Sequence, residues 1–299
     1  MNLKNSFHPY AAITILFWSM TYVLTRLTLQ YFSAFSMGFL WYFIASCTLL
    51  VVAIVTKMKL PRRADLLWIA ASGGTGFFFY MIAFNQGQAM VTACTGSVVL
   101  ATVPVITALL ACLIYQEKLR IFQWAAILIE FIGVIILTLM NGQLSVNTGL
   151  FWLFVAALCL STYNLIQRRL IKSYTAFQAS TYSIFFGTIL LAIFAPASIR
   201  EIPHAPAIQL VYIAIMGVLS SAIAYAAWAK AFSLAKQTSQ VSNYMFITPF
   251  LTSILGFFIA EEIPDHATLL GGGVILLGVI IFNFGGKFYG LSCDQKTQI

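Results

Sequence analysis

The chain has 299 residues, of which 61% are hydrophobic and 8% are charged, and its mean hydropathy is +0.93. A soluble globular domain has roughly 25% charged residues, so this composition excludes a soluble protein and indicates an integral membrane protein. The net charge of +8 is scattered over separate segments, which argues against a nucleic-acid-binding face. The five cysteines are odd in number and four lie inside apolar runs, so no disulfide framework is expected.

Long apolar runs follow one another along the chain. Because a membrane helix needs about 20 apolar residues, the uncharged run over 66–116 must contain two helices joined by a turn. The first run is long and lacks a small-residue cleavage site, so we interpret it as a helix and not as a signal peptide. The sequence predicts an all-α polytopic membrane protein with ten transmembrane helices, near 9–28, 33–56, 65–86, 91–114, 121–140, 148–170, 175–195, 207–232, 238–259 and 267–287.

Lysine and arginine predict the orientation, since short loops that carry them stay on the cytoplasmic side. With a cytoplasmic N-terminus, thirteen of the sixteen Lys and Arg residues fall on that side. Arg26 and Arg200 fall on the other side, and Lys230 lies within a predicted helix. We therefore expect both termini in the cytoplasm and a multi-pass protein of the cell inner membrane.

The second half of the sequence repeats features of the first. Pro104 and Pro249 lie 145 positions apart, and the same offset relates Tyr80 to Tyr225. We expect two five-helix repeats, and the odd number of helices in each makes the second insert upside down relative to the first. Inverted repeats are typical of secondary transporters, whose site lies near the midplane between the repeats. The predicted units are residues 1–143, residues 144–290 and a short cytoplasmic tail, 291–299.

Two segments carry a duplicated motif, "TVPVITALLACLIYQEKL" followed by "GVIIL", and "ITPFLTSILGFFIAEEI" followed by "GVIIF". Proline, glutamate and the Gly-Val pair stand in register in both. The pattern resembles the drug/metabolite transporter (DMT) superfamily, EamA branch, over nearly the whole chain. This resemblance implies a ten-helix carrier that exports amino acids, drugs or other metabolites through a central cavity. Family members often carry an arginine in the second helix, where this chain has Trp41 or Tyr42.

Polar and aromatic side chains inside the apolar runs are candidates to line that cavity. They cluster on the first, third and fourth predicted helices and on the sixth, eighth and ninth. Each of them could instead pack between helices or belong to an interfacial aromatic belt. The candidate substrate-binding residues are Trp18, Tyr22, Tyr80, Asn85, Ser97, Tyr163, Asn164, Tyr225, Trp228, Lys230 and Tyr244.

Two ionisable residues stand apart from the others. Glu130 lies midway along the fifth predicted helix, where a lone carboxylate costs roughly 2.5 to 3.5 kcal/mol. It is either a proton-binding coupling group or a structural glutamate that is protonated or hydrogen-bonded. Lys230 lies towards the inner end of the eighth predicted helix, where it either binds a substrate carboxylate or extends to the lipid headgroups.

Prolines and glutamates mark the duplicated motif. Pro104 and Pro249 each remove a backbone donor, so we expect kinked helices that serve either as hinges or as static packing features. Glu117 and Glu262 lie at the mouths of their helices, where a carboxylate can accept from the free N–H groups of a neighbouring helix N-terminus.

The predicted function is that of a secondary transporter rather than an enzyme. No metal-ligand spacing or phosphate loop is present, so we expect no catalytic residue, metal or cofactor. We expect a small amphipathic metabolite, such as an amino acid, to leave the cell by alternating access, with the proton as a candidate coupling ion. The alternatives are an uptake carrier for a quaternary amine or nucleoside derivative, an intramembrane enzyme and a lipid flippase. The expected partners are the substrate and the lipid bilayer, and no nucleic acid is expected. The sequence does not determine the oligomeric state, and it allows a monomer.

Overall fold

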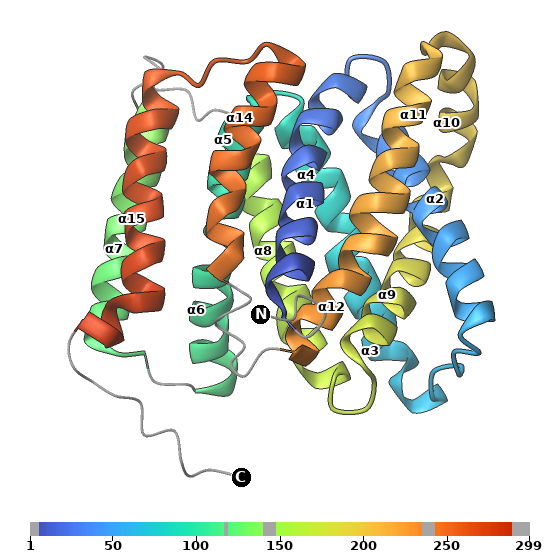
Figure 1. Cartoon of the computed structure of the whole chain (residues 1–299), viewed down its shortest axis with the longest axis horizontal. Coiled ribbons are helices and arrows are strands. Elements are labelled where there is room, and N and C mark those ends of the chain that lie inside the picture. The colour runs from blue at the N-terminus through green and yellow to red at the C-terminus, as the bar shows by residue number, and fades with distance from the viewer. Residues whose placement is uncertain (1–5, 117–118, 140–147, 235–242, 289–299) are drawn as a thin grey trace.

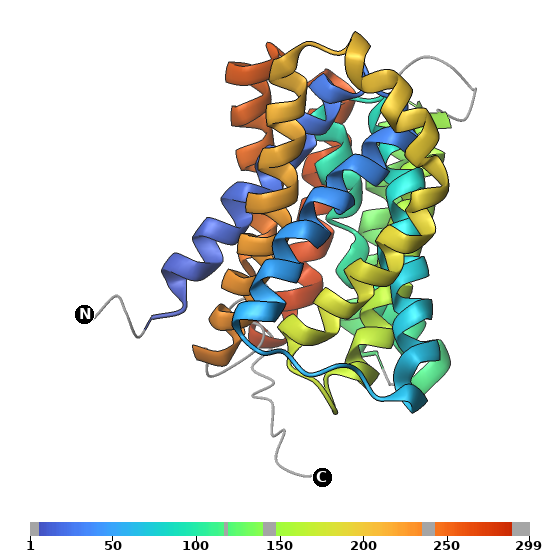
Figure 2. The same ribbon diagram turned by 90° about the vertical axis from the view of Figure 1, so that its right-hand side faces the viewer.

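The computed structural model describes residues 6–116, 119–139, 148–234 and 243–288. Within these ranges every regular element is a helix and none is a strand. The helices lie alongside one another in a bundle, which Figures 1 and 2 show from two sides. The prediction of an all-helical protein is confirmed.

Several of these helices can cross a membrane. Within the described ranges, seven stretches are long and apolar enough: His8–Thr28, Ala34–Val55, Arg63–Gln88, Ala93–Ile114, Thr148–Leu170, Ala176–His204 and Ala207–Trp228. Three shorter apolar helices cover Ile121–Gly133, Thr248–Ala260 and Thr268–Phe282. The chain is therefore a multi-pass membrane protein, because backbone polar groups in lipid must be satisfied within such helices.

The first half begins with α1 and α2, and α2 starts where the Ser33 side chain accepts a hydrogen bond from the Ser36 N–H. Thr92 caps α5 in the same way by accepting from Thr95. The elements are α1 (His8–Thr28), α2 (Ala34–Val55), η2 (Arg63–Asp65), α3 (Leu66–Gly73), η3 (Gly74–Phe79), α4 (Tyr80–Gln88), α5 (Ala93–Leu100), α6 (Val103–Tyr115) and α7 (Ile121–Leu139).

The second half has a similar order of helices. Its α9 starts with a capping box, in which Thr175 and Gln178 satisfy each other's backbone N–H groups. The elements are α8 (Thr148–Leu170), α9 (Ala176–Leu191), η4 (Ala192–Phe194), α10 (Ala195–Glu201), η5 (Ile202–His204), α11 (Ala207–Ile215), η6 (Met216–Ile223), α12 (Ala224–Leu234), η7 (Asn243–Ile247), α14 (Thr248–Ala260) and α15 (His266–Phe288).

Each half contains a helix that starts anew at a proline. α5 ends before α6, whose first turn contains Pro104, and Pro249 occupies the first turn of α14 after the 3₁₀ turn η7. Proline suits this place because its missing N–H would have no helical partner there. Ala101 and Thr102, between α5 and α6, keep right-handed helical dihedrals, so the chain stays helical in course while the regular hydrogen-bond pattern is interrupted just before the proline. Whether these two sites act as hinges stays a prediction.

A π-helical segment interrupts one long helix in each half. In the first half η3 leads directly into α4, which begins at Tyr80, and in the second half η6 leads into α12, whose second residue is Tyr225. π-helical turns are rare in proteins, and those that do occur are often found at functional sites. The sequence analysis did not predict these segments.

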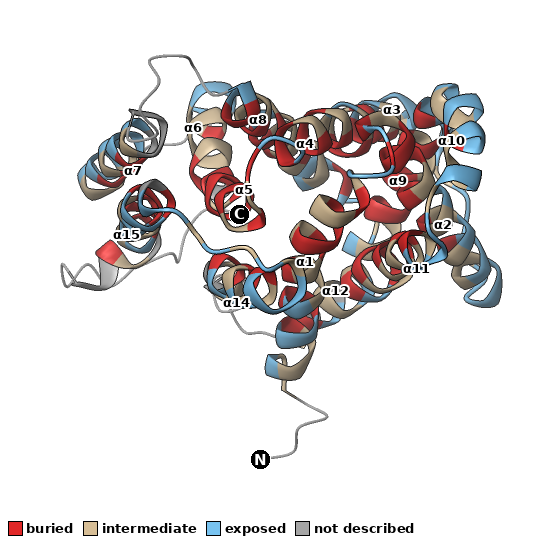
Figure 3. Ribbon diagram, turned by 90° about the horizontal axis from the view of Figure 1, so that it is seen from above, coloured by how far each residue is buried: buried red, intermediate tan, exposed pale blue. Residues whose placement is uncertain are grey.

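α7 and α15 form a closely packed pair at one side of the bundle (Figures 1 and 3). A Cβ atom at Gly133 would lie 2.8 Å from the Gly271 carbonyl oxygen, and one at Gly278 would lie 2.9 Å from that of Ala126. Such short distances leave no room for a side chain, so the two glycines allow the helix backbones to approach.

Candidate functional site

Aromatic side chains from both halves of the chain meet inside the bundle. We refer to this set as the aromatic cluster; its rings come from α1, α2, η3, α4, α8 and α12. Six of the predicted substrate-binding residues belong to it. Its members are Trp18, Tyr22, Trp41, Tyr42, Phe77, Tyr80, Phe84, Tyr163, Tyr225 and Trp228.

Ring contacts join the two halves directly. The Trp18 ring centroid lies 5.6 Å from that of Tyr225 and 5.2 Å from that of Trp228, so α1 contacts α12. Phe77 lies 5.3 Å from Tyr163 and 6.4 Å from Tyr225. These distances are typical of tilted and edge-to-face aromatic pairs, which stabilise a site beyond their apolar burial.

Tyrosine hydroxyl groups gather in the same region. Tyr22 and Tyr80 both pack against Phe84, each with a centroid distance of 5.5 Å. Tyr22, Tyr80 and Tyr225 all pack against the apolar core cluster that contains Phe77, Phe84 and Tyr163. The cluster therefore combines apolar ring faces with groups that can donate or accept hydrogen bonds.

The π-helical segment η6 orients two of the tryptophans. Trp18 Nε1 donates to the Ser220 carbonyl oxygen at 3.1 Å, and the Ser220 hydroxyl donates to the Phe17 carbonyl oxygen at 3.0 Å. Trp41 Nε1 donates to the hydroxyl of the next residue, Ser221, at 2.9 Å. These bonds satisfy the indole N–H groups, which lowers the cost of burying them.

On the opposite segment η3, a glycine makes room for a tyrosine. A Cβ atom at Gly76 would lie 2.2 Å from Cδ2 of Tyr163, so the ring packs directly on the backbone. The Tyr163 hydroxyl shares a 3.2 Å hydrogen bond with the Ser180 hydroxyl on α9. The two π-helical segments thus hold the cluster from both halves.

Sequence reasoning missed four members of the cluster. Phe77 and Phe84 were not among the candidates, and Trp41 and Tyr42 were noted only because the family arginine is absent there. The Tyr42 ring lies 5.1 Å from Phe77 and stacks on Trp41 at 5.6 Å. The position of the family arginine was the signal that could have placed α2 at this site.

Three other predicted residues make hydrogen bonds outside the aromatic cluster, two of them to another helix and one within its own helix. Asn85 is fully buried, and its Nδ2 donates to the Ala34 carbonyl oxygen at 2.9 Å. The Ser97 hydroxyl donates to the Cys94 carbonyl oxygen at 2.7 Å within its own helix. Asn164 Nδ2 donates to the Thr107 hydroxyl on α6 at 3.3 Å. None of these three hydrogen bonds is to a member of the aromatic cluster.

The last two predicted binding residues lie towards other parts of the fold. The Tyr244 hydroxyl is 2.6 Å from His8 Nδ1, so this ring packs against the start of α1. Lys230 is exposed on α12, one turn beyond Tyr225 and its neighbours. The structure therefore does not bring Tyr244 into the ring contacts of the cluster, and it leaves Lys230 at the surface of the bundle.

Glu130 lies outside the cluster, on α7. Its side chain is 4% exposed and packs against Gly278 of α15, and Oε1 has no hydrogen-bond partner among the described residues. A carboxyl group that is buried without a partner carries a large desolvation cost when ionised. A carboxyl group in this position can bind a proton. It lies on α7, which carries no member of the aromatic cluster.

Glu262 links several helices at one end of the bundle. Its Oε2 accepts a hydrogen bond from the N–H of Ala93, the first residue of α5, at 2.8 Å. Its Oε1 lies 3.3 Å from Nε of Arg26, whose guanidinium also donates to the Ala89 carbonyl oxygen. The prediction that Glu262 caps a neighbouring helix is confirmed, whereas Glu117 lies outside the described residues.

Across the described part of the chain, no group of three His, Cys, Asp or Glu side chains could hold a metal ion.

Comparison with known proteins identifies relatives over most of the chain. The chain is 31% identical to the uncharacterized transporter YdfC of Bacillus subtilis (strain 168), over 81% of this chain and 78% of that protein. It is 25% identical to a probable terminal-alkyne amino-acid exporter of Streptantibioticus cattleyicolor, over 91% of each chain. It is 22% identical to an S-adenosylmethionine uptake transporter of Rickettsia prowazekii, over 89% of this chain and 87% of that protein.

Structure and family comparisons agree with these relatives. A solved structure described as "Crystal structure of protein" superimposes with a TM-score of 0.61 and covers 92% of this chain and 96% of its own. Because the two sequences are 16% identical, this similarity shows the fold alone. The model of the EamA-like transporter family matches residues 7–139 and again residues 147–284. The chain therefore belongs to the EamA-like transporter family and is a membrane transporter rather than an enzyme.

Proposed function

We propose that the chain crosses the inner membrane ten times as two inverted five-helix repeats, 1–143 and 144–290, with both termini in the cytoplasm. The matching helix bounds support this organisation, since α6 and α14 begin and end 145 positions apart, and so do the starts of α7 and α15. Gln116 and Glu261, at the same offset, both have φ 54° where these helices end. The separate matches of the family model to the two halves also support a repeat.

The proposed substrate site is the aromatic cluster. The observation that carries this proposal is that its rings join helices of both halves, as in the contact between Trp18 on α1 and Tyr225 on α12. Alternating access moves one repeat against the other around such a site, so a ligand held there would become exposed to each side in turn.

The chemistry of the cluster favours a small amphipathic substrate. Ring faces can cover an apolar part, and tyrosine hydroxyls can bond a polar part, whereas none of the ten defined members carries a full charge at neutral pH. An amino acid or a related metabolite has both parts. Efflux is the proposed direction, and the similarity to a probable amino-acid exporter supports it.

A second candidate is uptake of a cationic metabolite, such as a quaternary amine or a nucleoside derivative. Aromatic faces attract cations within about 6 Å of the ring centroid, and this attraction strengthens where water is excluded. The relatives that are named as S-adenosylmethionine uptake transporters support this alternative.

Counterflow in proteoliposomes tests the proposal. The purified chain is reconstituted, and amino acids, quaternary amines and nucleosides are screened for saturable exchange. We expect exchange of one class, a strong loss in Tyr225→Ala, and normal exchange in the control Tyr31→Ala, because Tyr31 is exposed beyond α1. Exchange that survives Tyr225→Ala unchanged would contradict the assigned site. Movement of a labelled phospholipid without solute exchange would instead support a flippase.

A further inference from the structure

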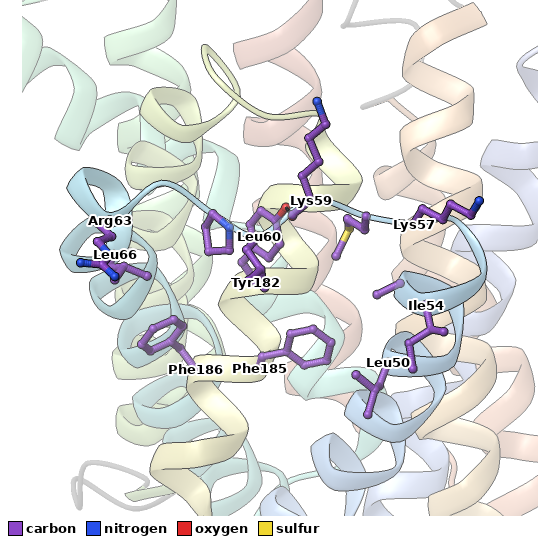
Figure 4. A pocket seen from close by; sticks show the side chains of 13 residues that line it. Leu50, Ile54, Lys57, Lys59, Leu60, Arg63, Leu66, Tyr182, Phe185 and Phe186 are labelled. Carbon is purple, nitrogen blue, oxygen red and sulfur yellow. Dashed lines mark hydrogen bonds between the residues drawn. The ribbon is translucent and has the colours of Figure 1, made fainter.

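A groove of about 660 Å³ lies where α2 ends and α3 begins, away from the aromatic cluster (Figure 4). Its walls are apolar side chains of α2 and α9, including Leu50, Ile54 and Phe185. Leu50 and Ile54 are exposed, and both helices belong to stretches that can cross a membrane. An exposed apolar wall on such helices faces lipid, so this groove opens to the bilayer.

The segment between α2 and α3 forms the roof of the groove and is fixed by hydrogen bonds. The Tyr182 hydroxyl on α9 donates to the Lys59 carbonyl oxygen. The Arg62 N–H donates to the Tyr174 hydroxyl at 2.9 Å, and that hydroxyl donates to the Asp65 carboxylate at 2.8 Å. The roof is therefore tied to the second half of the chain.

Basic side chains surround the mouth of the groove. Lys57, Lys59 and Arg63 belong to its lining, and all three are exposed. Figure 4 shows the amine of Lys59 pointing away from the helices, while the rings of Phe185 and Phe186 lie deeper. The segment between α2 and α3 carries four basic side chains and one carboxylate, Asp65, which accepts from Tyr174, so the segment keeps a net positive charge.

We propose that this groove binds an anionic phospholipid, with an acyl chain between α2 and α9 and the headgroup phosphate against Lys57, Lys59 and Arg63. The change from apolar wall to basic rim matches the change from acyl chain to phosphate along a lipid. Basic side chains hold phosphate oxygens by charge-assisted hydrogen bonds, and their apolar stems lie along the chain region. The basic segment is predicted to face the cytoplasm, where the leaflet is negatively charged. A lipid bound there would bridge α2 of the first half and α9 of the second.

Lipid titration of the purified full-length chain tests this site. Phosphatidylglycerol and phosphatidylcholine with identical acyl chains are added to the protein in detergent, and bound lipid is measured by native mass spectrometry. One basic side chain near an anionic lipid contributes about fivefold in binding, so Lys57→Gln/Lys59→Gln/Arg63→Gln should abolish the preference for phosphatidylglycerol. Ala53→Trp, which fills the groove without changing its charge, should weaken binding of both lipids.

The matched control is Lys172→Gln, because Lys172 is exposed in the turn before α9 but does not line the groove. We expect this variant to retain the wild-type preference. Equal binding of the two lipids by the wild type, an undiminished preference in the triple variant, or an equal loss in Lys172→Gln would each overturn the proposal. These measurements do not use transport, so their outcome is independent of the proposed substrate site.

Discussion

The α7–α15 pair allows the two halves of the chain to be compared side chain by side chain. Gly133 on α7 faces Ile275 on α15, and Gly278 on α15 faces Glu130 on α7. Glu130 and Ile275 lie 145 positions apart, so the carboxyl group of one half occupies the place that an isoleucine fills in the other. Packing at this place therefore needs an apolar side chain of similar size and does not require a carboxyl group.

A similar contrast separates α4 from α12. Both carry a tyrosine after a π-helical segment, Tyr80 and Tyr225, and both tyrosines belong to the aromatic cluster. Five residues further on, Asn85 is fully buried whereas Lys230 is exposed. α4 and α12 therefore have similar backbones but different side chains at this position. Such a difference makes the two halves unequal, which suits a substrate whose two ends differ in polarity.

The largest expected effect is at Glu130, where the two halves differ most in chemistry. We expect Glu130→Ile to abolish accumulation driven by a pH gradient while counterflow persists, because exchange needs no net proton movement. The isoleucine should fit, since Ile275 fills the equivalent place. Both activities are measured in proteoliposomes, with Ile275→Val as the control. Equal loss of the two activities in Glu130→Ile would mark a structural glutamate.

A second prediction concerns the close contact of η3 with α8. Gly76→Ala should destabilise the protein by about 1–3 kcal/mol, because the new Cβ would overlap the Tyr163 ring. Thermal unfolding in detergent measures this change, and counterflow should fall in parallel. Gly273→Ala is the matched control, since its Cβ would meet nothing within 4 Å. Equal stability of the two variants would show that Tyr163 can move away without cost.

Lys230 provides a smaller test of the asymmetry between α4 and α12. If its ammonium binds a substrate carboxylate, Lys230→Met should raise the apparent binding constant about tenfold, the effect of losing one charge-assisted hydrogen bond. Affinity for the decarboxylated amine analogue should stay nearly constant. Equal changes for acid and amine, or no change, would assign Lys230 to the lipid headgroups, as its exposure also allows.

The smallest effect is expected where the two halves agree. Pro104→Ala and Pro249→Ala should each slow transport more than they weaken substrate binding, because an alanine lets the preceding turn join the helix and removes a hinge. Rates and binding constants are measured separately for each variant. Wild-type rates in both variants would leave the breaks as static packing features.

The positions of most helices along the chain can be predicted from the sequence, because they depend on the length of each apolar run. An apolar run of sufficient length in lipid can satisfy its backbone only as a helix, so the predicted span near 148–170 coincides with α8, Thr148–Leu170. The repeat offset found at Pro104 and Pro249 also recurs in the bounds of α6 and α14. The cap formed by Glu262 was predicted because a carboxylate at the mouth of a helix can accept from the free N–H groups at the start of a neighbouring helix.

The sequence by itself determined that this chain is a multi-pass helical membrane protein of the EamA type, since composition, apolar runs and the duplicated motif are properties of the linear order. Only the tertiary structure decided which side chains meet. A residue added to a turn, as in η3 and η6, rotates the following side chains by about 100°. Such rotations and the contacts between distant helices bring Tyr42 and Phe77 into the cluster and direct Asn85 to the Ala34 carbonyl oxygen, and no local pattern encodes either outcome.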